Sequence, residues 1–126
     1  MPAVVDSSAV LAVIFNEPDS DAFLPLMHAG FISSVNLSEA VSKLSERGVS
    51  PDLAWAQLQD FRLNCVTFDS DQARSAGEMR ASTRDLGLSL GDRACLALAR
   101  QKGLPVLTTD RSMGEAKVGV EVQLLR

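Results

Sequence analysis

The segment GDRACLALARQKGLPVLTTD, residues 91–110, contains the signals that decide the fold of this chain. Residues 94–99 are apolar throughout, which is typical of a helix buried on most of its circumference. Gly103 suits the left-handed conformation in which many helices stop, and residues 104–108 then form a short apolar run typical of a strand. A buried helix, a tight stop and a buried strand make up half of a βαβ unit.

Further strand-like runs lie outward from this segment, and helical patterns separate most of them. A helix from about Ser34 to Arg47 has one apolar side, and Ser50 followed by Pro51 indicates the start of another helix. The strand-like runs are Ala3–Val5, Phe31–Ile32, Val66–Phe68, Val106–Thr108 and Val120–Leu124. Strands that alternate with helices predict an α/β fold in three layers, with a central, mainly parallel sheet of about five strands between helices.

Length and composition favour one domain over residues 1–126. The chain has 126 residues, 46% of them apolar, and no linker or repeat interrupts it. Its formal net charge of −4 differs from the basic balance of most nucleic-acid binders. A nucleic-acid-binding function therefore requires that some of the carboxylates gather around cations.

The two cysteines and the N-terminal region indicate the cellular compartment of the protein. Cys65 and Cys95 lie in apolar surroundings without a CxxC spacing, so we expect two buried, reduced thiols. No positively charged leader precedes the first strand. The longest apolar stretch, Ala9–Phe15, is far shorter than the roughly 20 residues that span a bilayer. We expect a soluble, cytoplasmic protein without a membrane segment.

Four acidic residues stand where the predicted sheet would bind a ligand. Asp6 and Asp110 each follow a predicted strand, at the carboxyl edge where open parallel sheets bind ligands. Asp92 lies in the first turn of the buried helix, which points to the same edge. Glu39 shares one face of its helix with Asn36 and Lys43.

Each acid also has an ordinary structural explanation. Asp6 and Asp110 are suited to cap the helices that follow them. Asp92 is suited to the first turn of a helix capped by Ser89, and Glu39 to an i,i+4 ion pair with Lys43.

Taken together, the four acids indicate a metal site. Like charges in one cleft repel each other unless a cation compensates them, and Mg²⁺ or Mn²⁺ prefers carboxylate oxygens and water. The single histidine, His28, is expected at the surface or at the edge of the core and not among the ligands.

The chain resembles the PIN domain, and in size and layout the VapC-type toxins of bacterial toxin–antitoxin pairs. The resemblance covers essentially the whole chain. It rests on the order and spacing of four short motifs: Val4–Ala9, Asn36–Glu39, Leu90–Asp92 and Leu107–Asp110.

This resemblance implies a metal-dependent endoribonuclease with Asp6, Glu39, Asp92 and Asp110 in the acidic positions. Under this hypothesis Asp6 and Asp92 hold the principal Mg²⁺ directly, while Glu39 and Asp110 act through water or hold a second ion. The supporting polar residues would be Ser8, Asn36 and Thr108. Met113 stands where family members commonly carry an aromatic residue.

The expected substrate is single-stranded or looped RNA, whose bases are accessible. Cationic side chains near the acidic motifs are candidates for RNA contact: Lys43, Arg47, Arg84, Arg93 and Arg111. The resemblance also implies a VapB-like antitoxin that lays a helix in an apolar groove, and a homodimer. Helical segments at residues 8–15 and 54–61 are candidates for these surfaces, although burial in the core explains their apolar residues equally well.

Two other functions remain open at this stage. A phosphohydrolase or receiver-like domain also places acids at strand ends, but Ser8 stands where the former has a second Asp, and no Lys follows Thr108 as in the latter. A non-catalytic module could use the acidic cleft only to dock a basic partner.

Overall fold

The computed structural model of the protein describes residues 1–125 and contains one five-stranded sheet. All neighbouring strands are parallel, in the order β3-β2-β1-β4-β5, so the first strand of the chain is the central one. The strands are β1 (Val4–Val5), β2 (Phe31–Ser33), β3 (Asn64–Val66), β4 (Val106–Thr108) and β5 (Val122–Leu124). The predicted α/β fold with a parallel sheet is confirmed.

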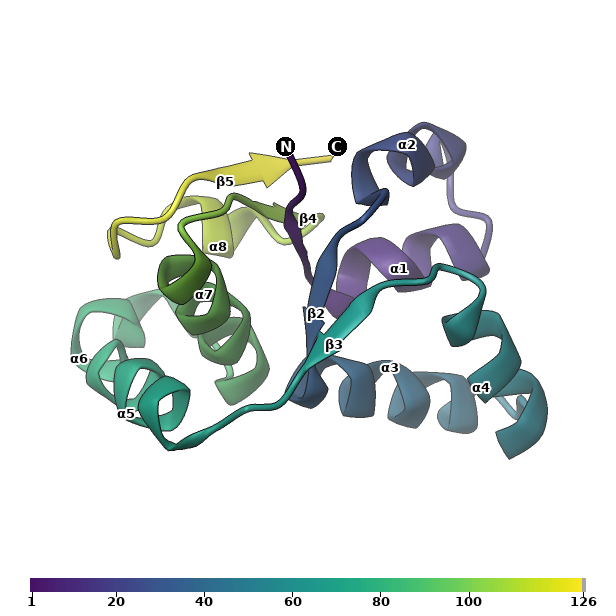
Figure 1. Ribbon diagram of the computed structural model, residues 1–126, viewed down its shortest axis with the longest axis horizontal. Coiled ribbons are helices and arrows are strands. Elements are labelled where there is room, and N and C mark those ends of the chain that lie inside the picture. The colour runs from purple at the N-terminus through teal and green to yellow at the C-terminus, as the bar shows by residue number, and fades with distance from the viewer. Residues whose placement is uncertain (126) are drawn as a thin grey trace.

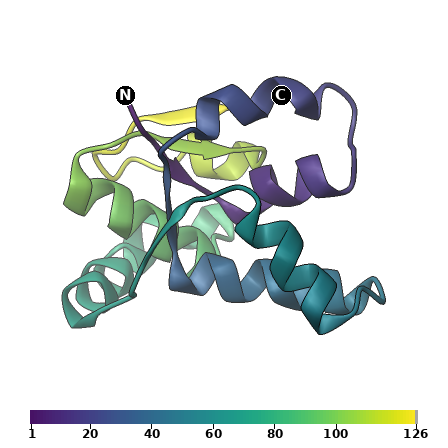
Figure 2. The ribbon, with the colours of Figure 1, turned by 45° about the vertical axis from the view of Figure 1, so that its right-hand side comes forward.

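Helices cover both faces of this sheet. α1 to α4 lie on one side of the strands and α5 to α8 on the other (Figure 1), and α4 lies alongside α3 (Figure 2). The α-helices are α1 (Ser7–Ile14), α2 (Leu24–Met27), α3 (Ser34–Glu46), α4 (Pro51–Gln59), α5 (Ser70–Glu78), α6 (Arg80–Thr83), α7 (Leu90–Lys102) and α8 (Arg111–Gly114). Two 3-10 helices, η1 (Ser20–Phe23) and η2 (Arg84–Leu86), complete the chain's helical elements within residues 1–125.

The central strand separates two hydrophobic cores. Val4 and Val5 are both fully buried, but successive side chains of a strand point to opposite faces. Val5 packs in the core beneath α1 and α3, while Val4 belongs to the core beneath α7. A strand buried on both faces reads as a continuous apolar run, which explains why β1 and β4 are recognisable in the sequence.

The helix cap and the helix stop expected from the sequence are both present. Ser50 Oγ accepts a hydrogen bond from Leu53 N (3.4 Å) at the start of α4. Residues 94–99 of α7 are all buried, and the helix ends at Gly103, whose φ of 66° is the left-handed stop.

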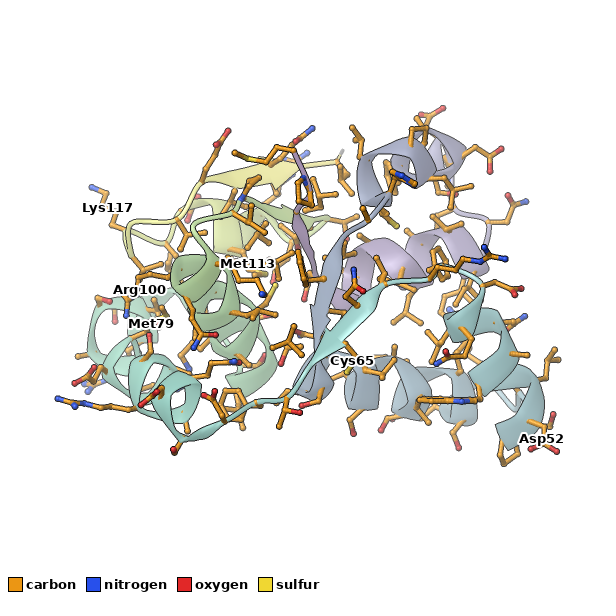
Figure 3. All side chains as sticks on the ribbon, viewed as in Figure 1. Asp52, Cys65, Met79, Arg100, Met113 and Lys117 are labelled. Atoms are coloured by element: carbon orange, nitrogen blue, oxygen red, sulfur yellow. The ribbon has the colours of Figure 1, made fainter. Side chains whose placement is uncertain are left out.

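Three sequence-based expectations require correction. β3 spans Asn64–Val66 instead of Val66–Phe68, because its parallel register with β2 pairs Phe31 with Asn64, and an edge strand tolerates a polar residue. β5 begins at Val122 instead of Val120. Cys65 is exposed on β3 (Figure 3), so only Cys95 is the buried thiol that was expected; both cysteines are free.

None of the helices within residues 1–125 is both long and apolar enough to cross a lipid bilayer.

Two glycines provide a matched test of the packing between β1 and β2. A Cβ on Gly30 would lie 2.9 Å from the carbonyl oxygen of Met27 and 3.0 Å from that of Ala3, whereas a Cβ on Gly77 would meet nothing within 4 Å. Gly30→Ala should therefore lower the free energy of unfolding by about 1–3 kcal/mol. Gly77→Ala, inside α5, should raise it by about 0.5–1 kcal/mol. Urea denaturation measures both, and equal effects of the two substitutions would contradict the packing described.

Candidate acidic site

Asp6 forms the buried centre of the candidate site. It follows β1 directly, and its side chain is only 3% exposed. Ser8 Oγ and Thr108 Oγ1 donate hydrogen bonds to the same carboxylate oxygen, Oδ2, over 2.7 and 2.8 Å. Although Asp6 stands at the N-cap of α1, its side chain makes no capping hydrogen bond, so the capping explanation is wrong for this residue.

The backbone after β4 orients the two hydroxyls. Thr109 N donates to Ser8 Oγ (3.1 Å), and Asp110 N donates to Thr108 Oγ1 (3.0 Å). Each hydroxyl has a single proton, and the two short contacts to Asp6 use both. The longer contact of 3.5 Å between Thr108 Oγ1 and Met113 Sδ therefore reflects packing of a fully buried methionine beneath the threonine.

Asn36 connects Asp6 to two other elements. Its side chain is fully buried, and its Nδ2 lies 3.5 Å from Asp6 Oδ1, 2.9 Å from Glu39 Oε1 and 3.1 Å from the carbonyl oxygen of Gly91. Three acceptors around one nitrogen establish the orientation of the amide. The amide oxygen, Oδ1, is buried without a hydrogen-bond partner among the described residues.

Glu39 turns into the site instead of pairing with a lysine. Its Oε1 accepts hydrogen bonds from Asn36 and from Ser7 Oγ (3.3 Å), and no ion pair with Lys43 occurs within residues 1–125. A Cβ on Gly91 would overlap the Glu39 carboxylate. The absence of a side chain at position 91 therefore allows α3 and α7 to bring Glu39 and Asp92 to the same place.

Asp92 and Asp110 both serve as helix caps, as their ordinary explanations predict. Ser89 and Asp92 form a reciprocal capping box at the start of α7, with Ser89 N donating to Asp92 Oδ2 over 2.9 Å. Asp110 Oδ1 accepts from Ser112 N (2.9 Å) at the start of α8. Asp110 is linked to Asp6 only through Thr108 in the described contacts.

Burial dominates the electrostatics of Asp6. Desolvation raises the pKa of this carboxyl from 3.8 to about 6; the hydrogen bonds from Ser8 and Thr108 oppose the rise, and the charges of Asp92 and Glu39 add to it. The pKa of the Cys95 thiol is raised well above its ordinary value, chiefly by burial and then by the same carboxylates. The structure therefore brings Asp6, Glu39 and Asp92 into electrostatic contact.

The candidate cationic residues differ in how freely they can contact a ligand. The Arg47 guanidinium stacks over Phe15 at 4.1 Å, and Arg93 donates to the carbonyl oxygen of Ala76 (3.0 Å). Lys43, Arg84 and Arg111 are exposed. His28 is exposed at the end of α2, away from the acids, as expected.

The chemistry of the donors fits a hard divalent ion. Asp6 Oδ1 has only the long contact with Asn36 among residues 1–125, and the neighbouring acids raise the free energy of its charged form. The buried amide oxygen of Asn36 has no hydrogen-bond partner in the part of the chain that the structure describes. No group of three or more His, Cys, Asp or Glu side chains within residues 1–125 is arranged around an ion position, and Asp92 Oδ2 and Asp110 Oδ1 each accept a capping hydrogen bond from the backbone.

The roles of two residues of this site were not predicted from the sequence. Ser7 donates to Glu39, and Gly91 provides the space that the Glu39 carboxylate fills. Gly91 stands directly before Asp92 within a recognised motif, which was a usable signal for close packing. Ser7 lies within the motif Val4–Ala9, but no local pattern indicates its partner, which lies 32 residues away.

The raised pKa of Asp6 predicts how stability depends on pH in metal-free buffer. The folded protein retains the Asp6 proton up to about pH 6, while the unfolded chain loses it near 3.8. The stability that the folded protein gains by retaining this proton is therefore fully present below pH 3.8 and is lost as the pH rises to about 6. The free energy of unfolding of wild type should fall by up to about 3 kcal/mol over this range relative to Asp6→Asn. Urea denaturation with EDTA measures it, and parallel curves for the two proteins would contradict the assignment.

Comparisons with known proteins agree with the geometry. A family model described as PIN domain matches residues 3–118. No curated protein matches the chain significantly.

Several solved structures have a similar fold. The DNA-bound VapBC structure from Salmonella typhimurium is 24% identical, with 98% of each chain covered and a TM-score of 0.76. VapBC2 from Rickettsia felis, bound to a promoter DNA fragment, is 17% identical, with 100% of each chain covered and a TM-score of 0.77. VapC20 from Mycobacterium tuberculosis, described as a toxin that cleaves the sarcin-ricin loop, is 17% identical, with 90% of this chain and 94% of that chain covered and a TM-score of 0.76.

The family model covers nearly the whole sheet and all four acidic positions, and the likeness of fold extends over at least nine-tenths of this chain in the three structures. The chain belongs to the PIN-domain family.

Proposed function

We propose that the protein is a metal-dependent endoribonuclease, and that it is the toxin of a toxin–antitoxin pair. The observation that carries the proposal is the buried carboxylate of Asp6 beside Glu39 and Asp92. None of the hydrogen bonds it receives within residues 1–125 comes from a cationic side chain. A site that concentrates negative charge without an internal cation is suited to bind one from solution.

Asp6 and Asp92 would hold the principal Mg²⁺, for which Mn²⁺ can substitute, with Glu39 and Asp110 completing the shell. Such an ion supplies an activated water and neutralises charge on the phosphate during in-line displacement. Ser8 and Thr108 occupy Oδ2 of Asp6 and leave Oδ1 with only its long contact to Asn36 among residues 1–125. Asn36 holds Glu39 next to Asp6. Asp92 Oδ2 accepts the capping hydrogen bond from Ser89 N, and Oδ1 would be available to join the shell.

RNA is the proposed substrate, single-stranded or looped. The similarity of fold to VapC20, described as cleaving the sarcin-ricin loop, supports a looped RNA. Lys43, Arg84 and Arg111 are exposed, their side chains make no hydrogen bond or ring contact among the described residues, and they would contact phosphates. Arg47 and Arg93 are less available, because each already contacts another part of the protein.

A VapB-like antitoxin is the proposed partner, as the VapBC complexes of similar fold suggest. An apolar groove of about 270 Å³ lies between α1 and α4, the two helices expected to supply it. Its lining residues are Val13, Ile14, Leu24, Gln57, Asp60 and Phe61. A partner helix with an apolar face is suited to such a groove.

A homodimer in the cytoplasm is also part of this proposal. It rests on the resemblance to VapC-type toxins, and on exposed apolar side chains such as Leu53 and Trp55 on α4. Sedimentation of the purified chain measures the oligomeric state.

Removing a central acid should abolish RNA cleavage. Asp6→Asn and Asp92→Asn should each lower the Mg²⁺-dependent cleavage rate by at least about 100-fold, because each removes a charge that holds the ion. The control is Asp85→Asn, an exposed acid in η2. Sequencing of cleavage ends in total RNA after brief expression provides the measurement.

Identical end profiles from wild type and Asp92→Asn would overturn the nuclease proposal. A wild-type protein without any Mg²⁺-dependent cleavage would instead favour an acidic module that docks a basic partner.

A small substitution at Gly91 should also impair the reaction. Gly91→Ala places a Cβ where the Glu39 carboxylate lies, so Glu39 must move away from Asn36. We expect cleavage to slow by about 10- to 100-fold, with a higher Mg²⁺ concentration needed for half-maximal rate. Gly77→Ala is the control, because its Cβ meets nothing. Unchanged Mg²⁺ dependence in Gly91→Ala would show that the position of Glu39 does not matter.

A further inference from the structure

A second cavity adjoins the acidic site along α3. Its volume is about 490 Å³, within the usual range of small-molecule sites. Ser7 and Glu39 belong both to its wall and to the acidic site, where Ser7 Oγ donates to Glu39 Oε1. The cavity therefore begins at the acidic site and extends along the helix past Ser38 and Ser42 to Glu46.

Half of the lining residues are serines. These four are Ser7, Ser34, Ser38 and Ser42. Ser7 and Ser34 already have partners, since Ser34 Oγ accepts from Phe68 N (3.0 Å). Ser38 and Ser42 are exposed, stand one helical turn apart and make no hydrogen bond among the described residues. Their hydroxyls are available to a ligand as donors or acceptors.

The charges of the wall oppose a phosphate and favour a neutral polar group. Lys43 is the one cation of the lining, against the two carboxylates of Glu39 and Glu46. A phosphate in this cavity would face net negative charge. A nucleobase is neutral, and its edges carry the donors and acceptors that serine hydroxyls can satisfy.

The lining contains no aromatic side chain, so a base would not be held by stacking on the protein. Val35 is the apolar member of the wall. Recognition would depend on hydrogen bonds to the base edge, and a binding site of this kind discriminates among bases more strongly than a stacking platform does.

We infer that this cavity binds one unstacked nucleobase of the RNA, next to the cleaved bond, through the hydroxyls of Ser38 and Ser42. The inference rests on the proposed ribonuclease function, because continuity with the acidic site is what places the base beside the reacting phosphate. It makes these two serines determinants of sequence preference, separate from the acids that hold the ion.

The test compares wild type with the double variant Ser38→Ala/Ser42→Ala. Both positions are exposed on a helix, and alanine favours helix more than serine does, so the variant should fold. Ser45→Ala is the control, because Ser45 is exposed on α3 but does not line the cavity.

The substrate is a synthetic RNA of about ten nucleotides that spans a wild-type cleavage site, with an abasic nucleotide moved through each position in turn. One abasic position beside the cleaved bond should raise KM of wild type and of Ser45→Ala by roughly threefold to tenfold for each lost hydrogen bond. The same position should have no such effect in the double variant, because its partner hydroxyls are already absent. The same abasic profile in all three proteins would overturn the inference.

Binding of the same RNA set in Ca²⁺, measured by fluorescence anisotropy, separates this inference from the nuclease proposal. If wild type cleaves no RNA, the nuclease proposal fails; the abasic scan is then made on a short synthetic RNA that wild type binds, and the Kd profiles of the three proteins decide whether the cavity holds a base. If wild type cleaves but the profiles do not differ between variants, the nuclease proposal stands and the base site is wrong.

Discussion

The burial of the Asp6 carboxylate is the constraint on which the rest of the site depends. Parallel pairing of β1 with β4 brings Asp6 and Thr108 to the same edge, and the backbone amides after β4 turn two hydroxyls toward Oδ2. These hydrogen bonds lower the free energy of the charged carboxylate, but desolvation raises it more, which leaves the pKa near 6. The fold thus holds an acid in a position that its own surroundings do not fully stabilise.

Among residues 1–125, the groups that donate hydrogen bonds to Asp6 and Glu39 are neutral. Asn36 bridges Asp6, Glu39 and the backbone of Gly91 with a single amide nitrogen, so three elements are connected without neutralising any charge. An arginine in this position would have formed ion pairs and stabilised the isolated protein. The uncompensated charge instead costs stability, as is common where a site must remain ready to bind a ligand.

Elements marked by a continuous apolar run could be predicted from the sequence. Features that depend on which strand pairs with which could not. The apolar helix α7 and the strands β1 and β4 were recognisable because burial on every side leaves a continuous apolar run. The position of β3 depends on its register with β2, and the exposure of Cys65 depends on β3 being an edge strand. Likewise, a strand-end acid that turns inward, such as Asp6, cannot be distinguished by sequence alone from one that caps a helix, such as Asp110.

The order of the strands has a consequence for synthesis on the ribosome. β1 precedes the other four strands in the chain but is central in the sheet, where it lies between β2 and β4, the fourth strand in chain order. Asp6 and its partner Thr108 are 102 residues apart, so the nascent polypeptide cannot close this contact until the residues between them have emerged. Every nascent chain that stops before β4 therefore lacks an assembled site, and a chain becomes competent only after Thr108 has left the ribosome.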